Sequence, residues 1–564
     1  MIMANKSAFN LTQGPERAAH RALLLGLGLN RTDLEKPLIG VANSWTDIVP
    51  GHIHLNEMAA AIREGIHSGG GIAREFHTCA VCDGLAQGHT GMSYSLPSRE
   101  NIADTIEIMA RSHCLDGLVL LCGCDKIVPG QLMAALRLNI PAIMVTSGCM
   151  EAGRCGTYEN LTLSSMRELA GAAVSGKISK SELEAIEEAA IPGAGSCSML
   201  GTANTMSCLA ESLGMTLPGM GASPARSAEK IRLSRASGET IIRLIESGIN
   251  SRNIITRDSL LNAITTDMAL GGSTNSILHL LALANEAELK LDLSDFEQLS
   301  TKVPHLCDLL PGGNYPLSEL YHEGGIPALL RELTPLVNME VKTVGGVKLG
   351  EAIDIYLRKR LPIRGNRVIR PLDKPLHSGG GLAVLYGNLA PEGAVIKTGA
   401  LRGCPDRMEG PALPFDSMEE AVRAALAGKI NKKDLVVVRY EGPAGGPGMR
   451  EMHMLSSLLS GMNSGAAVIT DGRFSGSSRG MCIGHVSPEA AAGGLLPLVE
   501  KGDLIKISIP DRHIDLMVEE KVLSGRKPAP PNKIFAPGLL ERYRQLAGSA
   551  ATGAVLKKGI PYEK

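Results

Sequence analysis

Aromatic side chains and long apolar runs are scarce in this chain of 564 residues. It has one Trp, six Phe and nine Tyr, about 3% of the sequence. So few rings argue against stacking on nucleic-acid bases or forming an aromatic platform for sugars. No apolar run reaches the roughly 18 residues that a membrane-spanning helix requires. The sequence therefore predicts a protein that binds neither nucleic acid nor a membrane.

Strong net charge and a secretion signal are absent as well. Lys plus Arg number 57 and Asp plus Glu 58, for a formal net charge of −1. Nothing in this balance favours a polyanionic partner. The first residues show no apolar segment followed by a cleavage site, so we predict a cytoplasmic location. There, the 12 cysteines are expected to be thiols or metal ligands rather than disulfides.

Apolar runs alternate with helical patterns over the first 370 or so residues. Strands are predicted at 37–43, 118–122 and 141–146, and helices at 54–68 and 98–112. Such alternation favours a parallel sheet covered on both faces. A longer helical stretch follows at 204–283, interrupted by Pro218 and Pro224.

The pattern of predicted secondary structure changes near residue 365. Beyond it, short apolar strands are separated by Gly/Pro turns, at 381–386, 393–397, 434–440, 466–470 and 503–509. This pattern predicts a smaller β-rich, barrel-like unit. We therefore predict an α/β protein with an N-terminal α/β/α domain (1–365) and a barrel-like C-terminal domain (366–564). The second domain should end in a linker at 527–532 and a helix at 535–547.

The segment Cys122-Gly-Cys124-Asp125-Lys126-Ile-Val-Pro-Gly130 follows the predicted strand 118–122. Polar groups at the carboxyl end of a parallel strand face the crevice where α/β proteins bind ligands. Thiolates select iron–sulfur clusters or zinc, whereas carboxylates select magnesium or manganese. Cys124 and Asp125 are therefore predicted to contact two different metals a few ångströms apart.

Two further cysteines are candidate ligands. Cys197 lies in a Gly-rich turn before a helix, where backbone N–H groups can donate to cluster sulfurs or an anion. Cys82 directly precedes Asp83. An isolated cysteine in an apolar setting is usually a small core residue, and we assign to the core the cysteines at 114, 122, 149, 208, 307 and 482.

Two carboxylates complete the candidate magnesium site. Asp83 opens a Gly-rich loop at 83–89, and Glu451 ends the segment 441–451, in which nearly every residue from 442 to 448 is Gly or Pro. Such a backbone allows close approach of a ligand. With Asp125 they would form a hard oxygen site suited to magnesium. Each alone also fits a carboxylate at the start of a helix.

Ser475 lies in a Gly-rich loop after the predicted strand 466–470. Such a serine is a candidate nucleophile or base, or a turn hydroxyl. The chain has no Walker-type phosphate loop, and no Gly-x-Ser-x-Gly in a hydrolase context. These residues alone leave its role open.

Nine ordered motifs resemble one enzyme family along nearly the whole chain. They lie at 49–55, 83–89, 95–100, 124–130, 268–275, 387–391, 445–451, 471–476 and 484–490. The chain resembles the dihydroxy-acid dehydratase / phosphogluconate dehydratase family. The resemblance implies an iron–sulfur hydro-lyase that removes water from a 2,3-dihydroxy acid to give a 2-keto acid.

The resemblance also assigns roles to residues. It implies magnesium ligands at Asp83, Asp125 and Glu451, with Lys126 as its carbamate. It implies cluster ligands at Cys124 and Cys197 and a base at Ser475. The plant-type branch of the family has a further cysteine where this chain has Gly51, so the nuclearity of the cluster, [4Fe–4S] or [2Fe–2S], stays open. Cys82 is the alternative third thiol.

Substrate and assembly are further expectations from this resemblance. The motifs at 445–451, 471–476 and 484–490 are similar to the branched-chain biosynthetic enzyme, which acts on 2,3-dihydroxy-3-methylbutanoate. The segment Cys197-Ser-Met-Leu-Gly-Thr-Ala departs from its usual Gly-Met-Phe-Thr-Ala pattern and favours sugar-acid dehydratases. A non-catalytic iron–sulfur protein is the alternative of another class. Family members imply a homodimer or a dimer of dimers.

Overall fold

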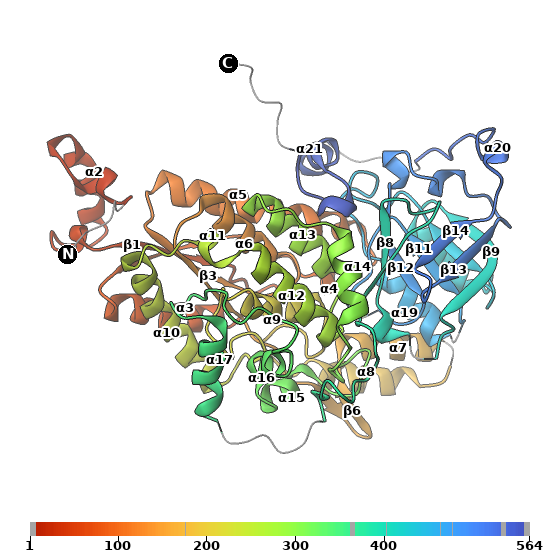
Figure 1. Ribbon diagram of the computed structural model, residues 1–564, viewed down its shortest axis with the longest axis horizontal. Coiled ribbons are helices and arrows are strands. Elements are labelled where there is room, and N and C mark those ends of the chain that lie inside the picture. Colours follow the sequence, from red (N-terminus) through yellow and green to blue (C-terminus); the bar gives the residue numbers. More distant parts are fainter. Residues whose placement is uncertain are drawn as a thin grey trace.

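The computed structural model describes residues 7–174, 176–360, 367–401, 403–462, 464–476, 478–531 and 537–557. Its N-terminal half is built on a fully parallel four-stranded sheet in the order β2-β1-β3-β4 (Figure 1). The strands are β1 (Leu38–Asn43), β2 (Ile72–His77), β3 (Gly117–Cys122) and β4 (Ala142–Thr146). The three predicted strands, β1, β3 and β4, are buried along their whole length. The apolar pattern does not predict β2, because polar residues interrupt it.

Helices cover both faces of this sheet. Crossovers between parallel strands are right-handed as a rule. The crossover from β1 to β2 runs toward one edge of the sheet and that from β3 to β4 toward the other. Helices α3 (Leu55–Ser68) and α6 (Ile127–Leu138) therefore lie on opposite faces. α3 packs against α10 (Ala228–Glu246), and α6 against α5 (Ser95–Ser112). This is the predicted α/β/α arrangement.

The predicted helical stretch 204–283 contains a run of separate helices. Pro218 and Pro224 fall between α9 and α10, as expected for residues that end helices. These helices are α9 (Thr202–Ser212), α10, α11 (Ser251–Ile254), α12 (Arg257–Leu270) and α13 (Asn275–Ala287). Other elements of this half are α1 (Phe9–Thr12), α2 (Ala18–Gly26), α4 (Asp83–Ala86), β5 (Gly153–Cys155), β6 (Tyr158–Leu161), α7 (Leu163–Val174), α8 (Lys180–Ala190), α14 (Leu293–Lys302), α15 (Leu317–His322), α16 (Gly325–Glu332) and α17 (Leu349–Arg358).

The C-terminal half contains a mixed sheet in the order β14-β13-β9-β10-β11-β12-β8-β7. Its strands are β7 (Ala383–Leu385), β8 (Gly393–Ile396), β9 (Arg407–Phe415), β10 (Leu435–Val438), β11 (Ala467–Thr470), β12 (Cys482–Ser487), β13 (Leu504–Ser508) and β14 (His513–Leu516). Tyr386, just after β7, donates its N–H to Arg512 O and accepts the N–H of Ile514, both at 2.8 Å. These bonds join the first and last strands, so the predicted barrel-like shape is confirmed.

Two strands of this barrel break the usual sequence rules. β9 contains Pro411 and Pro414, which cannot donate to a strand ladder, and β12 contains Gly484. Helices α18 (Met418–Leu426) and α19 (His453–Gly461) pack together, and α20 (Glu520–Leu523) and α21 (Leu539–Leu546) follow the barrel.

The predicted domain boundary at 365/366 lies outside the described residues, and so do the last residue of the predicted linker, 532, and the start of the predicted final helix, 535. The largest core cluster is centred on the N-terminal half and reaches Val384 and Val395 of the barrel strands, and two further clusters are built on the barrel strands. Within the described ranges, no helix combines the length and apolarity needed to cross a membrane.

Candidate active site

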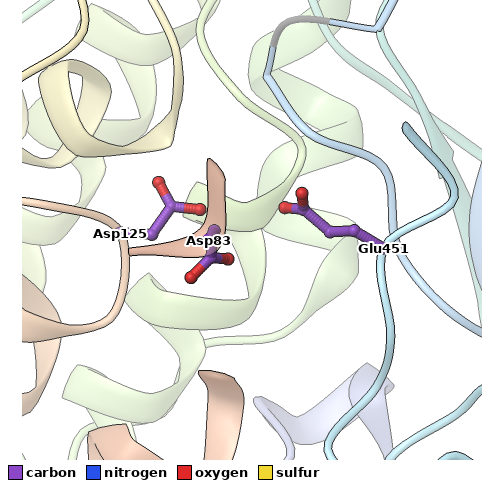
Figure 2. Close-up of side chains that lie close together, drawn as sticks. All are labelled: Asp83, Asp125 and Glu451. Atoms are coloured by element: carbon purple, nitrogen blue, oxygen red, sulfur yellow. The ribbon is translucent and has the colours of Figure 1, made fainter. Parts of the chain in front are cut away.

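Three carboxylates meet where the two halves of the molecule come together. Asp83 begins α4, Asp125 lies in the turn between β3 and α6, and Glu451 immediately precedes α19. Figure 2 shows the three side chains converging, and one oxygen of each lies within 4.8 Å of the others. Asp83 and Glu451 are buried. A compact group of carboxylate oxygens is the donor set that magnesium prefers.

Two buried cations bridge these carboxylates. The Lys126 ammonium lies 3.2 Å from Asp83 Oδ2 and 3.1 Å from Asp125 Oδ2. The Arg473 guanidinium lies 2.5 Å from Glu451 Oε1 and 3.1 Å from Asp83 Oδ2. Both cationic side chains are fully buried. The structure thus brings together all four predicted magnesium-site residues and adds an arginine that spans the two halves.

The surroundings shift the pKa values of the two aspartates of this site in opposite directions. Burial would raise the pKa of Asp83, but Lys126 and Arg473 outweigh it and hold that pKa well below its ordinary value. Burial raises the pKa of Asp125, and the charges of Asp83 and Glu451 add to the effect. A divalent cation would favour the ionised form of both groups.

Hydrogen bonds from three different segments orient Glu451 and Asp83. Gln87 Nε2 donates to Glu451 Oε2 at 2.5 Å, and Asn275 Nδ2 donates to Glu451 Oε1 at 3.0 Å. Ser95 Oγ donates to Asp83 Oδ1 at 2.5 Å. No sequence pattern singled out these partners or Arg473 as site residues. Each lies in one of the recognised motifs, which was the only available signal.

The two predicted cluster cysteines lie beside this group. Cys124 has a left-handed backbone, with φ 67°. A Cβ on Gly51 would lie only 2.9 Å from Cys124 Sγ, so a side chain at position 51 requires that thiol to move. The Cys197 segment is held close by Gly195, which donates to Pro50 O at 3.0 Å and has φ 133°.

Electrostatics place a third thiol in the same region. Burial raises the pKa of Cys197 to about 12 and that of Cys124 well above its ordinary value. In both cases, Cys82 is the neighbouring ionisable group that adds most to the effect of burial. Neutral buried thiols of this kind ionise when a metal replaces the proton. The donors therefore suit an iron–sulfur cluster flanked by a magnesium ion.

Ser475 lies at the exit of β11 in a loop held on both sides. Before it, Arg473 binds the carboxylates, and Thr274 Oγ1 donates to Phe474 O at 3.4 Å. After it, the buried Lys397 ammonium donates to Gly476 O at 2.8 Å. Ser475 is half-buried, whereas residues 471–474 and 476 are buried. The loop therefore leaves Ser475 partly accessible, two residues after the arginine that binds the carboxylates.

The assignment of six cysteines to the core is confirmed for five of them. Those at 122, 149, 208, 307 and 482 are buried. Cys114 is only half-buried, because it lies in the turn that ends α5 rather than inside a helix.

Comparison with known proteins identifies the family. The model for the dihydroxy-acid/6-phosphogluconate dehydratase N-terminal domain matches residues 36–352, and that for the C-terminal domain matches residues 367–554. The chain is 49% identical to a dihydroxy-acid dehydratase of Caldanaerobacter subterraneus subsp. tengcongensis, covering 97% of this chain and 98% of that protein. It is 47% identical to one of Pyrococcus furiosus, covering 97% and 99%. The chain therefore belongs to the dihydroxy-acid/6-phosphogluconate dehydratase family and is a hydro-lyase.

Proposed function

We propose that this protein dehydrates 2,3-dihydroxy-3-methylbutanoate to 3-methyl-2-oxobutanoate, a reaction of valine and isoleucine biosynthesis. The observation that carries the proposal is the buried carboxylate group beside Cys124 and Cys197. Such a site offers both a hard and a soft metal position to one small acid. The relatives, which match almost the whole of this chain, are named dihydroxy-acid dehydratases, and this supports a dihydroxy acid as the substrate.

Asp83, Asp125 and Glu451 are the proposed magnesium ligands, with Lys126 as its carbamate. As an ammonium, Lys126 lies against two of the carboxylates and would compete with a divalent cation. Addition of its neutral amine to CO2, with loss of one proton, would convert this competitor into an anionic oxygen ligand. Removal of CO2 from the buffer should then weaken magnesium binding, and bicarbonate should restore it.

Cys124 and Cys197 are the proposed cluster ligands, and Cys82 the third. Position 51 carries no side chain, and the space that its Cβ would enter is taken by Cys124 Sγ. Cys82 is the remaining thiol whose charge affects both of the others. Replacing it with serine should lower bound iron and sulfide, whereas the nearby exposed Cys79→Ser should leave both unchanged. Full iron content in Cys82→Ser would remove this residue from the site.

The chain's own residues suggest how the proton moves. Bound magnesium and the cluster would supply Lewis acidity toward the substrate oxygens. Ser475 Oγ is the proposed base that takes the C2 proton. A serine hydroxyl of ordinary pKa is too weak a base, so nearby cations must favour its ionised form. The C2–H bond breaks, hydroxide leaves C3, and the resulting enol tautomerises to the 2-keto acid.

Turnover by anaerobically prepared protein tests the proposed function. Protein supplied with iron, sulfide and magnesium should be brown, convert the branched dihydroxy acid to its keto acid, and lose activity in air. A brown protein that dehydrates no acid would favour the non-catalytic iron–sulfur alternative. A colourless, inactive protein would contradict both.

A sugar-acid substrate is the second candidate, and one position favours it. A Cβ on Gly201 would approach only Met199 Cε, at 3.9 Å, although Gly201 adjoins Gly476 in the Ser475 loop. The extra space beside the proposed base would accommodate a longer polyhydroxy chain. Gluconate, xylonate and arabinonate should therefore be compared with the branched acid. Turnover of an aldonate but not of the branched acid would reverse the order of the two candidates.

The same family membership supports a cytoplasmic homodimer or dimer of dimers. Light scattering on the metal-loaded protein would measure the mass of the particle, and a monomer would contradict this assembly.

A further inference from the structure

Helix α7 lies across both sides of the candidate site. On one side, its first residue, Leu163, contacts the turn after Asp83, where a Cβ on Gly84 would lie 2.9 Å from Leu163 Cδ2. On the other side, Ser164 Oγ lies 3.0 Å from Met199 Sδ, two residues beyond Cys197. One helical turn therefore connects the carboxylate loop with the thiol loop.

The C-terminal half holds α7 in this position. Arg479 forms an ion pair with Glu168 at 2.7 Å. α7 also packs against α19, where a Cβ on Gly171 would lie 3.6 Å from Gly461 Cα. Glu451 lies just before α19, so these contacts position α7 relative to all three carboxylates. The α7 residues that face the site are therefore held in a fixed position beside it.

Arg167 is the cation that α7 directs toward this site. Its Nη2 donates to Gly84 O in a long bond of 3.4 Å. Burial lowers the pKa of Arg167, and the charges of Glu451, Cys197 and Cys82 act in the opposite direction. Arg167 is half-buried, and its guanidinium lies close enough to both parts of the site for Glu451, Cys197 and Cys82 to affect it.

Arg167 differs from the other arginine of the site in its partners. Arg473 is paired with two carboxylates. Among the described residues, no carboxylate lies within ion-pair distance of Arg167, and its only hydrogen bond there is the one to Gly84. A guanidinium has five N–H donors, and those of Arg167 that do not bind Gly84 are not buried, so they are open to a ligand. An anion bound in the site would satisfy them.

We propose that Arg167 binds the carboxylate of the substrate. This inference rests on the proposed function, because every 2,3-dihydroxy acid carries that group. The planar guanidinium fork matches a carboxylate with two parallel hydrogen bonds. Arg167 is thus a substrate-binding residue contributed by α7, next to the carboxylates that would hold magnesium.

A comparison of two ligands with two proteins tests the contact directly. The ligands are 2-hydroxy-3-methylbutanoate, which lacks the C3 hydroxyl and cannot be dehydrated, and the corresponding neutral amide. Their dissociation constants would be measured by calorimetry on the metal-loaded wild type and Arg167→Met. A hydrogen bond to a charged group contributes about 1.5–3 kcal/mol, so the preference for acid over amide should fall roughly 10- to 100-fold in the variant.

Three further variants make the outcome specific. Arg167→Lys keeps the charge without the fork and should give an intermediate preference; it also serves if Arg167→Met does not fold. Arg154→Met, an exposed arginine in β5, should leave the preference unchanged. Glu168→Gln weakens only the anchor of α7 and should reduce the binding of acid and amide together. Iron, sulfide and magnesium contents should match the wild type in each.

Equal weakening of acid and amide in Arg167→Met, or no weakening, would overturn the proposal. Steady-state kinetics provide an independent reading: KM for the dihydroxy acid should rise about 10-fold or more, with kcat changed only a few-fold. Absence of turnover in the wild type would refute the proposed function, whereas the binding comparison would still decide the role of Arg167.

Discussion

The four-stranded sheet supplies Asp125 and Lys126 directly from the end of β3, whereas the barrel supplies Glu451 and Ser475 from loops. The first pair lies just after a fully buried strand, so the sheet fixes the position of its backbone. The second pair depends on side-chain contacts. Asn275 and Arg473 connect it with the other half, and Lys397 holds the Ser475 loop within the barrel half. The residues from the four-stranded sheet are therefore positioned mainly by the sheet, and the residues from the barrel are held by polar contacts that can be removed one at a time.

The largest loss should follow removal of a carboxylate from either side. Asp125→Asn and Glu451→Gln should each lower kcat by roughly 10³-fold or more, because metal Lewis acidity supplies several kcal/mol. Bound magnesium, measured by elemental analysis, should fall in both. Asp258→Asn, on the surface of α12, is the control. If both site variants retain bound magnesium, these carboxylates are not magnesium ligands.

Ser475→Ala should be the next most severe change. Loss of a positioned base typically costs 10²- to 10⁴-fold in rate, while the visible absorbance of the cluster should persist. Ser478→Ala, three residues along the same chain segment, is the matched control. If Ser475→Ala loses absorbance together with activity, the serine has a structural role instead.

Lys397→Met should act through Ser475 and have a smaller effect. Without the hydrogen bond to Gly476 O, the loop becomes less well positioned, and kcat should fall about 10-fold. In a Ser475→Ala background the same change should add nothing, because the two residues belong to one unit. The control is Lys230→Met, a second buried lysine that donates to a backbone carbonyl, that of Met220 at 2.7 Å. Additive losses would contradict this coupling.

The smallest effect on activity is expected for Lys230→Met. This change should instead alter how the free energy of unfolding depends on pH. Burial lowers the pKa of Lys230 to about 8 from 10.5. Between these values the unfolded chain binds more protons, so the free energy of unfolding should rise with pH across this window. Below pH 8 the full cost of the buried charge is present. Thermal melts from pH 8 to 10 should show this rise in the wild type and a flatter profile in the variant.

The same difference between the halves explains how far the sequence could be interpreted. Buried strands can be recognised as apolar runs in the sequence, so β3 and the position of the residues after it could be predicted. β9 was not, because its prolines imitate a turn. Arg473 contacts Asp83 from 390 residues away, and periodicity carries no information about such a pairing. Motif resemblance located the site residues, but the polar partners of Glu451 and the orientation of Arg167 required the structure.

The bonds between Tyr386 and residues 512 and 514 also bear on self-association. A sheet with a free outer strand offers unpaired backbone groups to another molecule and can grow by strand addition. Here the outermost strands, β7 and β14, are tied to each other. A second copy of the chain would therefore have to attach to the barrel through side chains rather than by extending its sheet.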